Sequence, residues 1–228
     1  MAILFLRRSS QRGHTKLDWL NSRHSFSFGD YYDPAHIGFG SLLVLNEDFI
    51  QPGKGFGLHP HKDMEIITIM LQGTLEHQDN MGNRGLLLPG EVQHMSAGRG
   101  VIHAEYNHSQ QETVHLLQIW IRPKEAGIKP SYEQLKYNLP KNMLVTIAAG
   151  TKNKKHLYLH QQAKISRGIF ESNKSVAHSP KHRTYLFLIT GKIILDGYEL
   201  QSGDAAGIIG DYAIQTKKES DVLFIDVF

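Results

Sequence analysis

The sequence predicts an all-β protein made of two antiparallel β-barrels in tandem, with few short helices. Helix signals are scarce along the 228 residues, whereas short apolar runs bounded by Gly, Pro, Asn and Asp recur throughout the chain. The order of these runs also repeats once, which is typical of two related β units. A chain of this length is long enough for two such units with a sizeable core.

Apolar runs of strand-like composition mark the expected elements in chain order. They are Ser41–Leu45, Glu65–Leu71, Gly85–Leu88, Val114–Ile121, Leu144–Ala149, Tyr185–Ile189, Lys192–Leu195 and Val222–Val227. The longest of them reads VHLLQIWI and is predicted to be a mostly apolar strand.

One segment, Arg122–Asn142, breaks the strand pattern. It contains Pro123, Pro130 and Pro140, with SYEQLKY between the last two prolines. Prolines at this density favour an irregular path, so we interpret the segment as a connection with room for one helical turn. The expected organisation is a first barrel over residues 1–121, the connection over 122–142 and a second barrel over 143–228.

Two short strings carry the strongest functional signal. They are GKGFGLHPHKDME from Gly53 to Glu65 and GRGVIHAEYN from Gly98 to Asn107, and their paired donors are His59 with His61 and His103 with Glu105. Side chains at i and i+2 of a strand point to the same face. Two such strands side by side would therefore direct three imidazoles and one carboxylate at a single point.

This donor set predicts a metal centre with an open coordination position. The chain contains no cysteine, so the ligands must be nitrogen and oxygen. Such ligands suit one divalent ion per chain, with Fe(II) expected first and Mn, Ni, Co, Cu or Zn as the other candidates. Four protein ligands leave one or two positions for substrate or dioxygen.

Glu65 is a rival ligand, because it has the same strand parity as His59 and His61. It could replace Glu105 in the first coordination shell, or it could orient one of the histidines from outside it. We favour Glu105, because its partner His103 is only two residues away.

The internal repeat predicts that only the first barrel keeps the metal centre. Met70–Gly98 and Leu188–Ile208 share one order of strands and turns, with Gly73 matching Gly191 and Gly90 matching Gly203. That alignment places Ala177, Ser179, Thr216 and Lys218 where His59, His61, His103 and Glu105 stand. His178 and His182 lie nearby without a third ligand, so we expect surface or hydrogen-bonding roles for them.

The motifs resemble those of the cupins, and more closely those of the pirin family. Gly53-x5-His59-x-His61-x3-Glu65 and Gly100-x2-His103-x3-Asn107 are similar to the two cupin motifs. HSFSFGDYYDP, HPHKDME, EHQDNMGN and QHMSAGRGVIHAE resemble pirin signatures over most of the N-terminal half, and a length near 230 resembles the bacterial pirin-like quercetinases. The resemblance implies a bicupin fold and carries the ligand roles onto His59, His61, His103 and Glu105, leaving Glu65 a non-ligand.

The resemblance also implies quercetin 2,3-dioxygenation with release of carbon monoxide. Glu105 would then accept the proton of the flavonol 3-hydroxyl as general base. Four apolar side chains are candidates for a pocket that holds a flat aromatic substrate: Phe26, Phe28, Phe56 and Met95. Each of them could instead belong to the core.

Two other functions fit the same ligands. The protein could be a non-catalytic metal or redox sensor that acts through protein partners, as is thought of some pirin relatives. It could also be another small-molecule cupin enzyme, such as an isomerase, which would turn over without dioxygen.

Composition restricts the partners. Lys and Arg number 25 against 22 Asp and Glu, and a formal charge of +3 does not indicate direct nucleic-acid binding. No apolar stretch approaches the ~18 residues of a membrane span, and the run MAILFLRRSS lacks the order of a signal peptide. We expect a cytoplasmic monomer that binds a small aromatic substrate and dioxygen, with no membrane contact.

Overall fold

The computed structural model describes residues 1–228 and is almost entirely β-structure. Besides one 3₁₀ turn, η1 (Ser9–Gln11), the elements are β1 (Ala2–Arg7), β2 (Gly13–Lys16), β3 (Leu20–His24), β4 (Leu42–Ile50), β5 (Gly55–His61), β6 (Glu65–Gln72), β7 (Leu75–Asp79), β8 (Arg84–Leu87), β9 (Glu91–Ser96), β10 (Val101–Asn107), β11 (Val114–Ile121), β12 (Ser131–Lys136), β13 (Val145–Ala149), β14 (Leu157–Tyr158), β15 (Lys164–Phe170), β16 (Ser175–His178), β17 (Arg183–Thr190), β18 (Lys192–Leu195), β19 (Tyr198–Gln201), β20 (Ala205–Ile209), β21 (Tyr212–Thr216) and β22 (Ser220–Val227). The all-β prediction is confirmed. Each strand that the apolar runs predicted is present, and the largest difference is in β4, which continues to Ile50.

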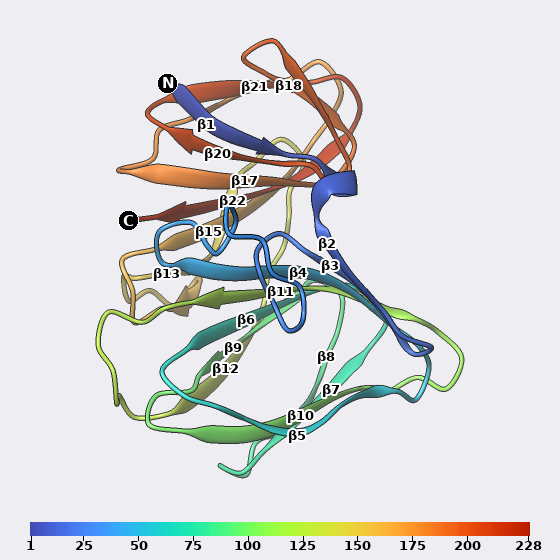
Figure 1. The fold of residues 1–228 in the computed structure, drawn as a ribbon. Coiled ribbons are helices and arrows are strands. Elements are labelled where there is room, and N and C mark those ends of the chain that lie inside the picture. Colours follow the sequence, from blue (N-terminus) through green and yellow to red (C-terminus); the bar gives the residue numbers. More distant parts are fainter. The chain divides into compact units, whose positions relative to one another are not determined.

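The chain divides into two compact units. The first barrel comprises Gly13–Tyr137 with Leu159–Gln161. Its two sheets have the strand orders β12-β9-β6-β11-β4-β3-β2 and β5-β10-β7-β8, and Figure 1 shows them facing each other. The central strands β6 and β11 are rich in Ile and Leu, and branched side chains favour strands. Both sheets contribute to a buried apolar cluster: Leu20, Ile50, Met70, Leu75, Leu87, Val114 and Leu116.

The second barrel comprises Met1–Arg12, Asn138–Tyr158 and Gln162–Phe228. Its sheets have the orders β1-β20-β17-β22-β15-β13-β14 and β16-β21-β18-β19. Pairing is antiparallel except between β13 and β14. Its core is apolar, with Leu186, Leu188 and Phe224 among the buried members.

The N-terminal segment differs from the expected boundaries, which assigned residues 1–121 to the first barrel. β1 instead pairs antiparallel with β20 of the second barrel. Arg8 donates to Asp204 at 2.8 Å, and the backbone N–H of Ser9 donates to the same carboxylate at 2.7 Å. Covering the exposed edge of β20 explains this placement, because an unpaired strand edge leaves backbone groups without partners.

The predicted connection over 122–142 is corrected, because it contains strand β12 and no helical turn. β12 pairs antiparallel with β9 at the edge of the larger sheet of the first barrel. Pro130 precedes this strand and Pro140 follows it, so neither proline removes a hydrogen bond from it.

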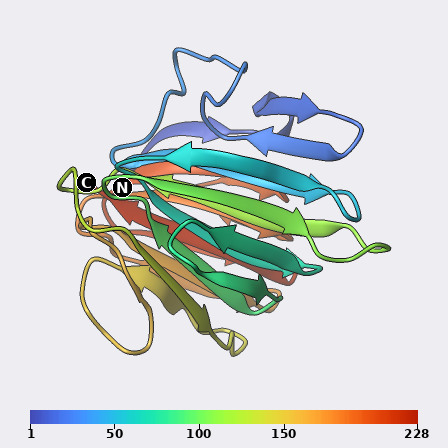
Figure 2. The ribbon, with the colours of Figure 1, turned by 90° about the horizontal axis from the view of Figure 1, so that it is seen from below.

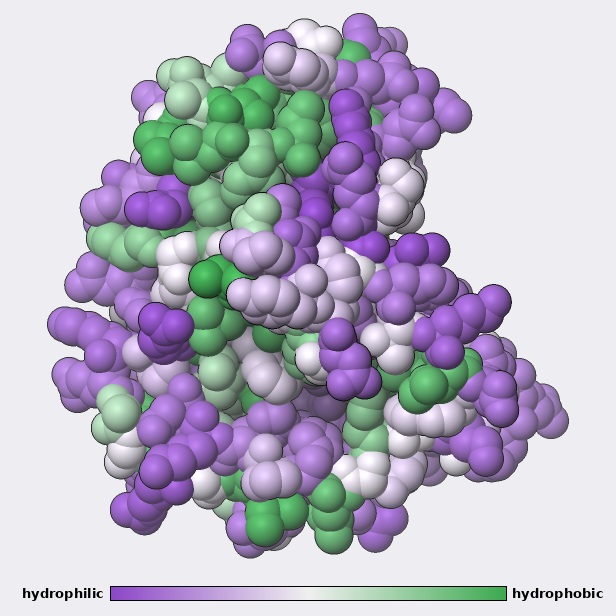
Figure 3. All heavy atoms as spheres, in the orientation of Figure 1, coloured by the Kyte–Doolittle hydropathy of each residue, from purple (hydrophilic) through white to green (hydrophobic).

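The surface of the second barrel carries an apolar region. Figure 3 shows apolar side chains gathered over β1 and β20, where Met1, Leu4 and Ile209 are exposed.

The structure has no helix with the length and apolarity that crossing a membrane would require.

Candidate metal centre

Strands β5 and β10 bring the predicted histidines together. The two strands run side by side and antiparallel (Figure 2). Their register places His103 opposite His59. The ring centroids of His59 and His103 are 4.4 Å apart, those of His59 and His61 4.8 Å, and those of His61 and His103 4.9 Å. One ring nitrogen from each histidine lies within 4.8 Å of the others, a spacing that one metal ion could bridge.

The hydrogen bonding of these rings fits a metal ion. Both ring nitrogens of His103 are buried without a hydrogen-bond partner, a costly arrangement unless a ligand occupies the site. His59 donates from Nδ1 to the carbonyl oxygen of Gly57 at 2.7 Å, which leaves Nε2 with a lone pair. The three imidazoles are therefore arranged as nitrogen ligands.

The protonation state of the rings also suits metal binding. Burial, reinforced by the neighbouring imidazoles, lowers the pKa of His61 to about 4 and that of His103 to about 3. Both rings are neutral at neutral pH, the form in which imidazole coordinates a metal.

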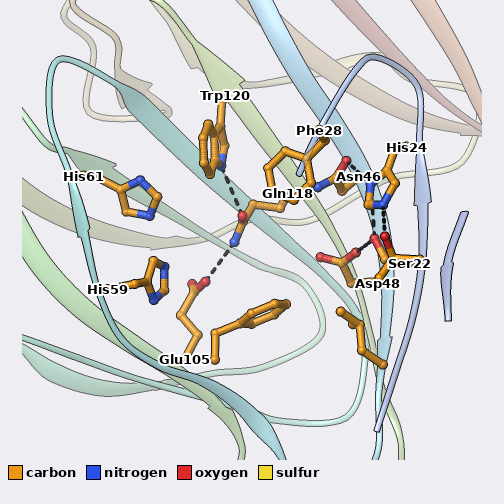
Figure 4. Close-up of a pocket in the computed structure, with 13 residues that line it drawn as sticks. Ser22, His24, Phe28, Asn46, Asp48, His59, His61, Glu105, Gln118 and Trp120 are labelled. Atoms are coloured by element: carbon orange, nitrogen blue, oxygen red, sulfur yellow. Dashed lines mark hydrogen bonds between the residues drawn. The ribbon is translucent and has the colours of Figure 1, made fainter. Parts of the chain in front are cut away.

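Glu105 lies beside the histidines and is held by two amides. Gln118 donates to one carboxylate oxygen at 2.8 Å and Gln93 donates to the other at 3.2 Å. Trp120 in turn donates to the Oε1 atom of Gln118 at 3.1 Å. Figure 4 shows the Glu105 carboxylate directed toward the space beside His59.

A bulge between His103 and Glu105 shifts the register of β10 against β5, so Glu105 stands opposite Phe56. Its carboxylate oxygen forms a compact group with His103 and with a fourth histidine, His77. His77 is buried and hydrogen-bonds Asp79 at 3.2 Å. His103 thus belongs both to the three-histidine group and to the group that contains Glu105.

A cavity of about 240 Å³ opens beside His59, His61 and Glu105. Of the expected pocket residues, Phe28 and Phe56 line it. Phe26 and Met95 do not; both are buried, and Met95 packs against Ile66 and Val101 in the core. The volume of the cavity is slightly below that of typical ligand pockets, which measure about 300–1,000 Å³.

Glu65 lies away from the metal centre and orients none of its histidines. Its carboxylate accepts hydrogen bonds from His94 at 3.0 Å, Ser96 at 2.6 Å and the backbone N–H of His160 at 2.9 Å. The alternation that suggested a shared face for His59, His61 and Glu65 is interrupted at Asp63. This residue lies in the turn between β5 and β6 and has a positive φ of 50°.

The Glu65 network predicts a pH-dependent contribution to stability. Burial raises the pKa of Glu65, but the hydrogen bonds and charge of His94 and the bond from Ser96 outweigh it and lower the pKa to about 2. A depressed pKa stabilises the fold above the unfolded value of 4.5, and this contribution is lost as the pH falls toward 2. We expect Glu65→Gln to lower the free energy of unfolding by about 3 kcal/mol at pH 7 and by much less at pH 3.

Urea unfolding of both proteins at the two pH values measures this difference. Glu133→Gln, at an exposed position of β12, is the control and should change neither value. An equal loss at pH 7 and pH 3 would show that the carboxylate charge is not the cause.

Several residues of this site were not found from the sequence. They are Gln93, Gln118 and Trp120 around Glu105, and Thr15, Leu20, Ser22, His24, Asn46 and Asp48 in the cavity wall. One signal was available in β4, where Asn46 and Asp48 replace apolar residues in the alternating row of buried positions that includes Leu42 and Ile50.

All groups of convergent metal-ligand side chains lie in the first barrel. In the second barrel, His178 hydrogen-bonds Asp226 at 2.7 Å and His182 packs against Phe228 with ring centroids 3.7 Å apart. The two histidines therefore take part in a hydrogen bond and a ring contact rather than in a ligand group.

Comparison with known proteins gives a consistent set of relatives. Residues 6–121 match the family described as Pirin, and residues 146–227 match the quercetinase C-terminal cupin domain. A quercetin 2,3-dioxygenase of Escherichia coli strain K12 is 40% identical over 229 residues, which cover 99% of each chain.

Solved structures with the same fold include a nickel complex. The bacterial pirin YhhW from Escherichia coli, crystallised with nickel(II), has a TM-score of 0.94 at 39% identity, with 98% of each chain covered. A quercetin 2,3-dioxygenase from Acinetobacter baumannii has a TM-score of 0.79 at 19% identity, with 98% of this chain and 85% of that chain covered. At this low identity, the similarity supports the fold alone.

Proposed function

The chain belongs to the pirin family, and from that premise we propose that it is a metal-dependent dioxygenase that opens the heterocycle of flavonols such as quercetin and releases carbon monoxide. The observation that carries the proposal is the buried His103, whose two ring nitrogens have no partner among the protein groups. Relatives that share 40% of the sequence are named for this reaction.

We assign the ligand roles to His59, His61, His103 and Glu105. The three neutral imidazoles and the carboxylate suit one divalent ion, and we infer Fe(II) as its identity. When bound, the ion supplies a Lewis acid for the ionised flavonol hydroxyl and for dioxygen. The relative crystallised with nickel supports a divalent ion in this fold.

Glu105 is the group that accepts the proton of the flavonol 3-hydroxyl. Glu105 lines the cavity, and the amides of Gln118 and Gln93 hold its carboxylate in place. A base must lie within hydrogen-bond reach of the proton that it removes, and the place of Glu105 in the cavity wall supports this role. Trp120 maintains the arrangement by fixing the orientation of the Gln118 amide.

The cavity wall favours a flat aromatic substrate. Phe28 and Phe56 line it, and Phe28 packs edge-on against Trp120 with ring centroids 5.4 Å apart. Aromatic walls bind planar rings by burying apolar area and by ring contacts. Oxygen attack on the ionised substrate then breaks the heterocycle, and one dioxygen is consumed for each carbon monoxide released.

Metal analysis followed by a gas-exchange assay tests the proposal. Protein purified without added metal should contain one divalent ion per chain. After loading with Fe, Mn, Ni, Co or Cu in turn, at least one form should consume dioxygen and release carbon monoxide in equal amounts when quercetin is added. Removal of the metal with a chelator should stop both. Absence of turnover with every metal would refute the dioxygenase, and turnover without dioxygen would favour an isomerase.

A further inference from the structure

A row of polar side chains crosses the inner face of the larger sheet of the first barrel. Each residue of the row is paired across neighbouring strands with the next one. In order, they are Gln93, Thr68, Gln118, Asn46 and His24. The adjacent row is mostly apolar and contains Met95, Ile66, Trp120 and Val44. Polar side chains inside a barrel cost free energy unless they are satisfied, so an in-register row of them calls for a function.

The two ends of this row have different surroundings. Gln93 and Gln118 hold Glu105 at the metal centre. At the other end, Asn46 and His24 meet a second cross-strand pair, Ser22 and Asp48, on the same two strands β3 and β4. Figure 4 shows these four side chains on the side of the cavity away from His59 and His61.

The four side chains form one hydrogen-bonded group, which we name the distal cluster: Ser22, His24, Asn46 and Asp48. Ser22 donates to Asp48, and the Nδ1 atom of His24 lies 2.8 Å from the Oδ1 atom of Asn46. The Ser22 hydroxyl joins the two pairs, because it lies 3.4 Å from the same Nδ1 atom. The Nε2 atom of His24 lies 2.8 Å from the hydroxyl of Thr15. No member exceeds 3% exposure, so the group is pre-organised away from bulk water.

The distal cluster is part of the cavity wall. All four members line the cavity, together with Phe28, Phe56 and Leu20. Figure 4 places Phe28 between Gln118 and the distal cluster. The cavity thus has a metal-ligand end, an apolar middle and a second polar end.

We propose that the distal cluster is a binding subsite for the hydroxyl groups that an aromatic substrate carries away from its metal-binding end. This inference rests on the proposed function, because it takes the other end of the substrate to the metal centre. A phenolic hydroxyl is a hydrogen-bond donor, and the Asp48 carboxylate, which already accepts from Ser22, stands in the cavity wall as an acceptor. Asp48 is the carboxylic side chain of the distal cluster, so we expect it to make the main contact with the ligand hydroxyl.

The subsite selects polyhydroxylated flavonols over those that carry only the 3-hydroxyl. A ligand with distal hydroxyls gains hydrogen bonds at the distal cluster, whereas a ligand without them gains none there and binds less tightly. Quercetin and 3-hydroxyflavone are the matched pair of probes. 3-Hydroxyflavone keeps only the 3-hydroxyl, which is the group expected to bind at the metal centre.

The test measures the equilibrium binding of each flavonol to nickel-loaded protein under nitrogen. Binding is monitored by the change in absorbance during a titration. In the wild type, quercetin should bind more tightly than 3-hydroxyflavone. Asp48→Asn keeps the volume of the side chain and should raise the dissociation constant of quercetin about tenfold, while that of 3-hydroxyflavone changes less than twofold. Ser22→Ala should reduce the preference in the same direction and serves as the second variant if Asp48→Asn does not fold.

Glu47→Gln is the matched control. Glu47 precedes Asp48 on β4, points to the opposite face and hydrogen-bonds His115 at 3.1 Å. It should leave both dissociation constants unchanged.

The outcomes separate this subsite from the proposed reaction. An unchanged ratio of the two dissociation constants in Asp48→Asn and Ser22→Ala would overturn the subsite, as would an equal loss for both ligands or no binding of either. A changed ratio supports it. If the ratio changes while no metal-loaded form turns quercetin over, the reaction is refuted and the subsite stands.

Discussion

His103→Ala is expected to abolish both metal binding and quercetin turnover. His103 is shared by both groups of convergent ligands, and neither of its ring nitrogens has a partner within the protein. Loss of a residue that only supports a metal ligand typically costs 10–100-fold in affinity, so loss of this ligand should cost more than about 100-fold. Elemental analysis after dialysis, with oxygen uptake on the same sample, measures both effects. His59→Ala should behave in the same way.

The control for this variant is His178→Ala in the second barrel. His178 is a buried histidine that hydrogen-bonds a carboxylate and belongs to no ligand group. It should keep the metal and the turnover of the wild type, even if the protein becomes less stable. Stoichiometric metal in His103→Ala would contradict the assignment of the centre.

Glu105→Gln is expected to lower kcat by about 10²- to 10⁴-fold, the usual contribution of a general base. The substitution preserves size but removes one metal ligand, so the variant is loaded with excess metal through its three remaining histidines before the assay. Steady-state oxygen uptake with quercetin gives kcat, and elemental analysis gives the metal content. The pairing of low kcat with retained metal separates proton transfer from ligand loss.

Glu76→Gln on the neighbouring strand β7 is the comparison for this variant. Its carboxylate accepts from Arg84 at 2.8 Å and from His108 at 3.1 Å, outside the cavity. Turnover should be unaffected. A wild-type kcat in Glu105→Gln would remove the carboxylate from the mechanism.

Much of the fold was predictable because its signals are local. Apolar runs between turn residues identified β6, β11, β17 and β22, since branched side chains on a half-buried strand produce that pattern wherever the strand pairs. The polar strands β2 and β3 gave no such run. β1 lies in the second barrel because it covers the edge of β20, and its own sequence carries no sign of that partner.

The candidate site follows the same division. The sequence by itself determined that His59 and His61 share a face and that His103 belongs near them, because side-chain alternation along a strand is local and has a period of two. Register, bulges and turns are set by pairing between distant segments. Only the tertiary structure decided that the bulge in β10 turns Glu105 toward Gln93 and Gln118, and that the turn at Asp63 sends Glu65 to His94. The distal cluster likewise forms only where β3 and β4 pair, because each strand supplies two of its four side chains. The local sequence of one strand does not specify which strand it pairs with.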